Sequence, residues 1–162
     1  MPAEPDDSAV LDVMDRKILR RLKDNARIAN SDLARAVGLS ASACLSRVRS
    51  LRARGVISRF TLEMDPRALG YTFQALVSVR IKPGARQLMG DMAEELRRVP
   101  EVTQVFILGG TQDFLIHVQV RDADEVRQFV LENLSGNPAV ALTETSIVFE
   151  HHVTSLGLPD LG

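Results

Sequence analysis

The order of apolar and polar residues in the first part of the chain predicts a series of short helices. Apolar residues recur every three or four positions across residues 11–24, which is the spacing of an amphipathic helix. Asp12 resembles an N-cap, and Asp15 three residues later favours the positive end of this helix. A second short helix is predicted to be capped by Ser31 and to end at Gly38, a residue type that tolerates positive φ.

A third helix is predicted between Ser40, an N-cap residue, and Gly55. Its inner face consists of apolar residues at helical spacing, Cys44, Val48 and Leu51. Leu45 flanks this face. Two short helices around a glycine-containing turn are typical of a helix-turn-helix unit, whose second helix enters the major groove of DNA. Residues 31–54 therefore form the candidate DNA-reading unit.

The segment that follows is predicted to link two domains. Residues 59–65 alternate apolar and polar side chains, which predicts a strand. Pro66 and Gly70 then bracket a single helical turn. We place the domain boundary in this region.

The second half of the chain has the rhythm of an α+β domain. Runs of apolar and β-branched residues predict strands, and apolar stripes at helical spacing predict helices between them. The strands are expected at 71–81, 102–108, 114–120 and 142–150, and the helices at 86–98 and 122–134, the second capped by Asp122. The order β-α-β-β-α-β predicts a ferredoxin-like fold, a four-stranded antiparallel sheet with two helices on one face.

The opposite face of this sheet is expected to lack a covering layer. The strands contain enough apolar residues to supply both faces: Val77, Val79, Ile81, Val118, Val120, Ile147 and Phe149. An uncovered apolar sheet face predicts self-association.

The composition of the 162-residue chain is that of an ordinary globular protein, with 45% hydrophobic and 25% charged residues. No run of about 18 apolar residues indicates a membrane span. The acidic residues 1–10 lack a basic segment followed by an apolar core, so we expect a disordered lead-in rather than a secretory signal. A single cysteine, Cys44, excludes an internal disulfide and fits a reducing cytoplasm.

The formal net charge of −1 conceals an asymmetry. Residues 11–60 contain twelve Lys and Arg against four Asp and Glu, a charge of +8, whereas residues 61–162 carry −6. A basic N-terminal unit beside an acidic C-terminal unit indicates two domains, of which only the first binds a polyanion.

Serine and arginine side chains on the second and third predicted helices are the candidate DNA contacts: Ser31, Ser40, Ser42, Ser46, Arg47 and Arg49. A helix N-terminus offers backbone N–H groups to a phosphate, and serine hydroxyls add further hydrogen bonds. An arginine in the major groove binds O6 and N7 of guanine with both arms of its guanidinium. The alternative is that these residues form an ordinary solvated helix face.

Neither a metal site nor a catalytic centre is expected. His151 and His152 are adjacent, and adjacent residues on a strand point to opposite faces, so the two cannot readily share one ion. His117 is interpreted as a partly buried polar residue, and Cys44 as a small buried hydrophobe rather than a redox switch. We expect no cofactor.

The sequence resembles the Lrp/AsnC, or feast/famine, family of transcriptional regulators over residues 11–154. The resemblance rests on four motifs: LDVMDRKILRRLKDNARIANSDLARAVGLS at 11–40, SACLSRVRSLRARGVISRFTLEMDPRALG at 42–70, GGTQDFLI at 109–116 and TETSIVFE at 143–150. The first two are long and specific, whereas the last two are short.

The resemblance implies a two-domain regulator. Its parts would be a helix-turn-helix (winged-helix-like) domain at 11–58, a strand-containing linker at 59–70, a ferredoxin-like effector-binding and oligomerisation domain at 71–154, and a tail at 155–162. Family members pair through their sheets into dimers, often stacked into octamers, and bind amino acids or related small molecules between the modules. The expected partners are therefore double-stranded DNA, a small-molecule effector and further copies of the chain. The expected location is the cytoplasm, at the nucleoid, with no membrane.

The resemblance also implies an effector-binding turn, formed by Gly109, Gly110, Thr111, Gln112 and Asp113, and we expect Thr143 and Thr145 on the last strand to face the same cleft. Glycines let a backbone approach a ligand closely, and a carboxylate binds an ammonium group. The family commonly has Gly-Asp-x-Asp here, whereas Thr111 replaces the first Asp. The effector is therefore expected to differ from the usual amino acids, or the site to be idle. By pattern alone, the turn is a bulged hairpin in which Asp113 bonds its own backbone.

Two other functions fit parts of the sequence. Sirohaem decarboxylases share this two-part architecture, but their chemistry would need a tetrapyrrole cleft lined with His and Arg. Here the basic residues gather in the helix-turn-helix, and only three histidines exist. A small-molecule sensor without DNA binding is the other possibility, against which the Ser- and Arg-bearing helix argues. We expect a regulator without enzymatic activity.

Overall fold

The computed structural model describes residues 11–152. The predicted lead-in at 1–10 and the tail at 155–162 lie outside this range. The chain divides into two compact units, the first extending to Glu63 and the second beginning at Met64, and each is considered by itself.

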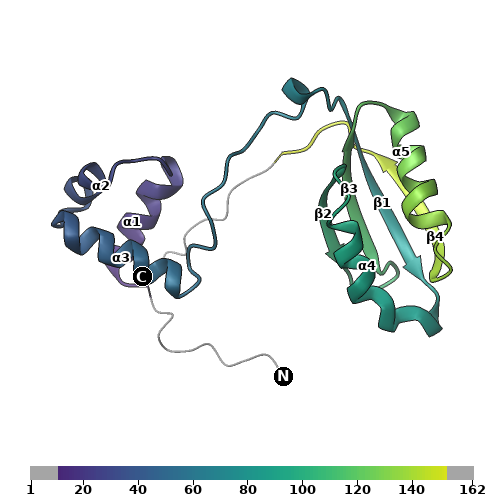
Figure 1. Cartoon of the computed structure of the whole chain (residues 1–162), viewed down its shortest axis with the longest axis horizontal. Helices are drawn as coiled ribbons and strands as arrows, with labels where there is room; N and C mark the ends of the chain where they lie inside the picture. Colours follow the sequence, from purple (N-terminus) through teal and green to yellow (C-terminus); the bar gives the residue numbers. More distant parts are fainter. Residues whose placement is uncertain (1–10, 153–162) are drawn as a thin grey trace. The chain divides into compact units, whose positions relative to one another are not determined.

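Within residues 11–63, the first unit contains three helices (Figure 1): α1 (Val13–Asp24), α2 (Asn30–Val37) and α3 (Ala41–Ala53). The carboxylate of Asp12 accepts the backbone N–H of Asp15 at 2.7 Å, and the hydroxyl of Ser40 accepts that of Ala43 at 3.2 Å. Gly38 ends α2 with a φ of 75°. These caps confirm the predicted starts of α1 and α3 and the predicted end of α2.

Six buried side chains from all three helices form the core of this unit: Ile18, Leu33, Ala34, Val37, Cys44 and Leu51. Cys44 is fully buried, as predicted, and burial raises the pKa of its thiol. A buried thiol with a raised pKa is a poor nucleophile, so Cys44 acts as a packing residue.

The prediction that Ser31 caps α2 is wrong. The N-cap is Ala29, whose backbone is extended and which provides no side-chain cap, so Ser31 lies inside the first turn. The side chain of Asn30 instead donates to the carbonyl of Ala41 at 2.8 Å. This bond ties the start of α2 to the start of α3.

The predicted strand at residues 59–65 is also wrong. This segment is described throughout and contains no strand. Phe60, Leu62 and Met64 nevertheless keep their alternation and are 46%, 79% and 57% exposed. The pattern suits a strand, but a strand forms only beside another strand, and within residues 11–152 none pairs with this segment. The predicted helical turn is present at Arg67–Leu69.

The second unit has the predicted β-α-β-β-α-β order: β1 (Phe73–Ile81), α4 (Met89–Leu96), β2 (Val102–Ile107), β3 (Phe114–Val120), α5 (Ala123–Val130) and β4 (Val140–Ile147). A 3-10 segment (Pro83–Leu88) precedes α4, and a π-helical turn (Leu131–Ser135) follows α5. The strands form an antiparallel sheet in the order β2-β3-β1-β4, with β2 and β3 as the predicted hairpin. The side chain of Asp122 caps α5, as expected.

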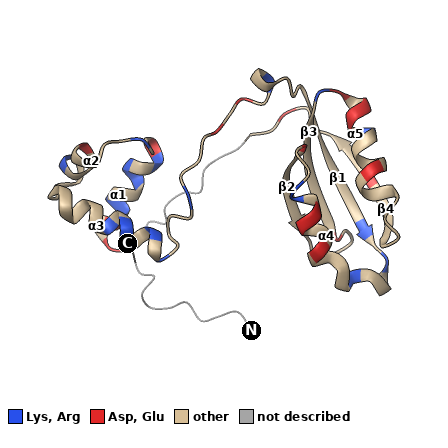
Figure 2. Ribbon diagram, in the orientation of Figure 1, with Lys and Arg blue, Asp and Glu red and all other residues tan. Residues whose placement is uncertain are grey.

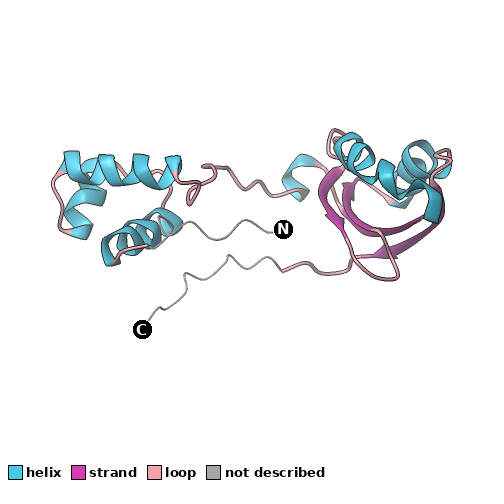
Figure 3. Ribbon diagram, turned by 90° about the horizontal axis from the view of Figure 1, so that it is seen from below, coloured by secondary structure: helices cyan, strands magenta, loops and turns pink. Residues whose placement is uncertain are grey.

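Both α4 and α5 cover one face of this sheet (Figure 3). Alternate residues of β1 and β3 pack beneath them, joined by Met92 and Leu96 of α4 and by Val126 and Phe129 of α5. Phe114 is the largest of the fully buried side chains in this core.

Most of the seven apolar residues that were expected to supply both faces of the sheet lie on its helix-covered side. Five of the seven residues expected to serve both faces are buried beneath the helices: Val77, Val79, Ile81, Val118 and Val120. Ile147 lies opposite Ala75 and so belongs to the same side, although it is half exposed. The open face carries the intervening residues instead, with leucines and Phe106 among polar side chains: Leu76, Ser78, Gln104, Phe106, Leu115, His117, Leu142 and Glu144.

Candidate functional site

The exposed side of α3 is a continuous stripe at helical spacing. Ser42, Ser46 and Arg49 lie on this stripe and are exposed, as the sequence indicated. Leu45 and Arg52 share the same side and were missed, although their i+3 spacing from Ser42 and Arg49 could have revealed them. Within residues 11–152 the Arg49 guanidinium has no hydrogen bond or ion pair, so it is free to bind a ligand.

The start of α3 presents two hydroxyl groups. The Oγ atoms of Ser40 and Ser42 lie 3.2 Å apart, and Ser40 also caps the helix. Backbone N–H groups at the start of a 13-residue helix attract anions. This end of α3 has the chemistry of a phosphate-binding site, with Ser31 exposed in the first turn of α2.

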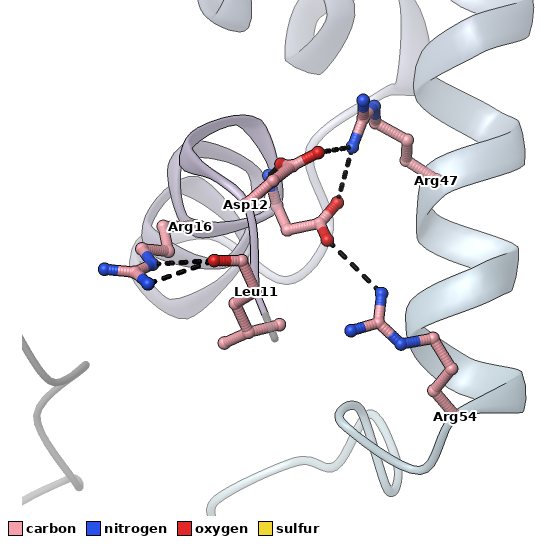
Figure 4. A network of polar contacts seen from close by, with 6 residues as sticks. Leu11, Asp12, Arg16, Arg47 and Arg54 are labelled. Carbon is pink, nitrogen blue, oxygen red and sulfur yellow. Dashed lines mark hydrogen bonds and ion pairs between the residues drawn. The ribbon is translucent and has the colours of Figure 1, made fainter. Parts of the chain in front are cut away.

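Arg47, another candidate DNA contact, turns inward toward α1 (Figure 4). Its Nη1 atom lies 2.5 Å from Oδ2 of Asp12 and 2.9 Å from Oδ1 of Asp15. Arg54 also reaches α1, where its Nη1 atom lies 3.3 Å from Oδ2 of Asp15. The backbone N–H of Asp15, and then the Arg47 guanidinium, lower the pKa of the Asp12 carboxyl below its ordinary value. Arg47 is therefore engaged within the domain.

The basic character of this domain is visible in Figure 2, where Lys and Arg mark α1 to α3 and acidic residues mark α4 and α5. Asp12 and Asp15 are paired with Arg47 and Arg54, so these four charges largely offset one another. The other basic residues of 11–60 still outnumber the remaining acids. The first unit thus offers a polyanion both positive charge and a free recognition stripe.

The predicted effector turn is held by side chains from β1 and the following 3-10 segment. The buried carboxylate of Asp113 accepts the N–H of Ile81 at 2.8 Å and lies 3.3 Å from Nε of Arg86. Nε of Arg80 donates to the carbonyl of Thr111 at 3.1 Å. Gly110 has a φ of 146°, which favours glycine there. The carboxylate of Asp113 therefore already has partners inside the chain, Ile81 and Arg86.

Thr143 and Thr145 lie on β4, one strand away from the turn, because the backbone N–H of Asp113 donates to the carbonyl of Val79 on β1. They pair with Val79 and Val77, which places them on the helix-covered side of the sheet. Thr145 lines an apolar hollow of about 390 Å³ between α5 and β4, together with Phe73 and Ile147.

Two family models account for nearly the whole chain. A winged helix-turn-helix DNA-binding model matches residues 11–58, and an Lrp/AsnC ligand binding domain model matches residues 74–158. The second match alone spans more than half of the sequence. The chain belongs to the Lrp/AsnC family.

Full-length relatives agree with this family assignment. The HTH-type transcriptional regulator AldR of Mycolicibacterium smegmatis is 43% identical over 93% of this chain and 89% of its own length. The transcriptional regulator AzlB of Bacillus subtilis is 33% identical over 93% and 96%. A Neisseria meningitidis transcriptional regulator, solved as a complex with L-methionine, superposes with a TM-score of 0.81 at 30% identity over 93% and 97%. The predicted family and fold are confirmed, and the chain is a helix-turn-helix transcriptional regulator.

In this Lrp/AsnC protein, residues 11–152 contain no group of three or more His, Cys, Asp or Glu side chains arranged to hold a metal ion. Over the same residues, every helix is too short or too polar to cross a membrane.

His117 is buried on the open face of the sheet. Its ring nitrogens lie 2.9 Å from the hydroxyl of Thr103 and 3.1 Å from Oε1 of Gln74, and the ring of His151 packs edge-on at 4.9 Å. Burial, and secondly the charge of His151, lower the pKa of His117 below 6.5. The pairing with polar neighbours confirms a buried polar residue.

Acidification is expected to destabilise the effector domain through His117. Between its lowered folded pKa and the unfolded value near 6.5, the unfolded chain binds more protons, so the free energy of unfolding falls as pH falls through this window. Well above pH 6.5 the imidazole is deprotonated in both states, and the effect vanishes. Urea denaturation at pH 7.5, 6.5 and 5.5 should show a smaller loss for His117→Gln than for the wild type, and parallel profiles would contradict this.

Proposed function

We propose that this regulator binds a specific DNA sequence through the exposed stripe of α3. The observation that carries the proposal is the unpaired guanidinium of Arg49 on that stripe, with Ser42 and Ser46 beside it. Arg49 would bind a guanine edge, while Ser31 and Ser40 would contact phosphates at the starts of α2 and α3. We assign Arg47 to a supporting position, because its guanidinium is bound by acids of α1.

The protein is proposed to act as a homodimer, which could stack further into an octamer. A single short helix reads few base pairs, and two copies one helical turn apart, about 34–36 Å, multiply the affinity. Two exposed apolar features support self-association: the open sheet face with Phe106 and Leu142, and the extended linker with Leu62.

An amino acid or a related small molecule is proposed as the effector, bound between subunits near the turn Gly109–Asp113. The L-methionine complex of the Neisseria relative supports this class of ligand. Thr143 and Thr145 on β4 would line the same site, since Thr143 pairs with Val79, whose carbonyl accepts the backbone N–H of Asp113. Such a ligand shifts DNA binding only by its differential affinity for the competing assemblies.

We propose no enzymatic activity, in keeping with the transcriptional regulators to which the chain is similar. The one buried histidine of residues 11–152, His117, has polar partners at both ring nitrogens, which suits a structural role. A protein with this function would act on the chromosome, in the cytoplasm and at the nucleoid.

Selection from a random-sequence duplex library tests the DNA-binding proposal. The full-length protein should enrich a two-fold symmetric site whose half-sites are separated by one helical turn or a multiple of it. Enrichment of no common sequence after repeated rounds would refute sequence-specific binding. An asymmetric single half-site would refute the paired arrangement alone.

Removal of the Asp113 carboxylate is expected to weaken effector binding by disordering the turn. Asp113→Ala leaves the buried N–H of Ile81 without its acceptor, which costs about 1–3 kcal/mol locally. Asp113→Asn keeps an acceptor for Ile81 and is expected to retain more binding. Calorimetry against the twenty amino acids, repeated on both variants, gives the answer. Undiminished affinity in Asp113→Ala would remove this residue from the site.

A further inference from the structure

The recognition helix α3 has an apolar pattern that defines its inner side only weakly. Cys44 and Leu51 are fully buried, but Leu45, about 100° around the helix from Cys44, is 38% exposed. Burial of apolar surface is non-directional, so it discriminates little between rotations of a helix whose apolar residues extend beyond one narrow stripe. A directional contact must contribute to the rotational setting.

Asp15 of α1 supplies such a contact. Its side chain is only 7% exposed, and its two carboxylate oxygens bind different arginines, Arg47 at 2.9 Å and Arg54 at 3.3 Å (Figure 4). A buried carboxylate is strongly unfavourable unless it is paired and hydrogen-bonded. The burial of Asp15 therefore favours the orientation of α3 in which both guanidiniums reach α1.

The spacing of the two arginines makes this contact sensitive to rotation. Arg47 and Arg54 are seven residues apart, which is two helical turns and about 10.5 Å along the axis, so they project from the same side of α3. A turn of α3 by one residue, about 100°, would carry both away from Asp15 and would move the exposed stripe by the same angle. Asp12 reinforces the contact between Arg47 and α1, because its Oδ2 atom lies 2.5 Å from Nη1 of Arg47.

We propose that Asp15 is a positioning residue for DNA recognition, which sets the rotation of α3 through Arg47 and Arg54 and so directs Arg49, not Arg47, at the bases. This inference rests on the proposed DNA binding through the exposed stripe. Asp15 itself touches no DNA in this arrangement. Its effect appears in the discrimination between sequences, because a shifted stripe still presents positive charge to any phosphate backbone.

The test compares affinities for the duplex selected above and for a scrambled duplex of equal length, at fixed salt. Asp15→Asn is expected to lower the ratio of the two affinities by about tenfold or more, the loss of one bidentate base contact. Asp24→Asn removes the same charge from the exposed end of α1 and should leave the ratio unchanged while raising both affinities. Loss of stability alone would reduce the active fraction for both duplexes and would not move the ratio.

A double-mutant cycle separates positioning from direct contact. If Arg47 acts through Asp15, Arg47→Gln should lower the ratio in the wild-type background. In the Asp15→Asn background the same substitution should cause no further loss. A full additional loss from Arg47→Gln would place Arg47 on the DNA and overturn the proposal. An unchanged ratio in folded Asp15→Asn would overturn it equally.

Arg54→Gln keeps the proposal testable if Asp15→Asn fails to fold, as judged by circular dichroism. It retains the Arg47–Asp15 pair and removes the second contact, so the ratio should fall in the same direction by a smaller factor. An unaltered ratio in that variant would refute the positioning role. The wild-type ratio is measured first: a value of one would refute the proposed function itself, and with it this inference.

Discussion

Arg49→Ala is expected to reduce affinity for the selected duplex by about 10- to 100-fold, because a bidentate arginine–guanine contact discriminates by about 1–3 kcal/mol. The Arg49 guanidinium is exposed on α3 and has no hydrogen bond or ion pair within residues 11–152. Its removal therefore disturbs no described contact of the fold. Fluorescence anisotropy at fixed salt measures the loss.

Two matched variants interpret that result. Arg49→Lys keeps the charge but not the planar fork, so it should recover affinity for scrambled DNA but not for the selected site. Arg98→Ala removes an exposed arginine from the acidic second unit and should change neither affinity. Equal losses in Arg49→Ala and Arg98→Ala would mean that α3 contributes only net charge.

Phe114→Ala is expected to destabilise the effector domain by about 3–5 kcal/mol, the usual cost of deleting a fully buried aromatic ring. Phe114 lies in β3 opposite Val79 and beneath the helices, where the lost ring leaves a cavity. Tyr71 is the only tyrosine of a chain without tryptophan, so its fluorescence during urea denaturation reports this domain. A stability of 5–15 kcal/mol is typical of a domain, so this variant approaches unfolding.

Leu88→Ala is the control for Phe114→Ala at equal protein concentration. Leu88 is in the same domain but is 48% exposed, so its truncation should cost less than about 1 kcal/mol. Similar losses in the two variants would contradict the placement of Phe114 at the centre of the core.

The order of elements was predictable because it depends on local periodicity. The alternation of β1 and β3 and the caps Asp12, Ser40 and Asp122 are properties of neighbouring residues, and the structure confirms them. Which face of a strand is covered depends on pairing and on where the helices pack. For that reason the pattern did not show that Val77, one of the residues expected to supply both faces, lies beneath the helices.

Arg47 shows where a sequence pattern reaches its limit. Arg47 precedes Val48 of the inner face, so it lies at the border between the buried and exposed sides of α3. From the pattern alone, a side chain at this border can point toward the core or toward solvent. The acids that bind it, Asp12 and Asp15, are 35 and 32 residues away in the chain and meet it only after α1 packs on α3. The linker is the converse case: its alternation was visible, but the partner that would make it a strand is absent from residues 11–152.

The most direct test of the central claim is the salt dependence of binding to the selected and the scrambled duplex by the wild-type protein. We expect the selected duplex to bind more tightly at every salt concentration. For both duplexes the logarithm of affinity should fall linearly with the logarithm of salt concentration, with a slope near −0.9 per phosphate neutralised. Equal affinity for the two duplexes, or binding that salt does not weaken, would contradict DNA reading by the basic helix-turn-helix domain.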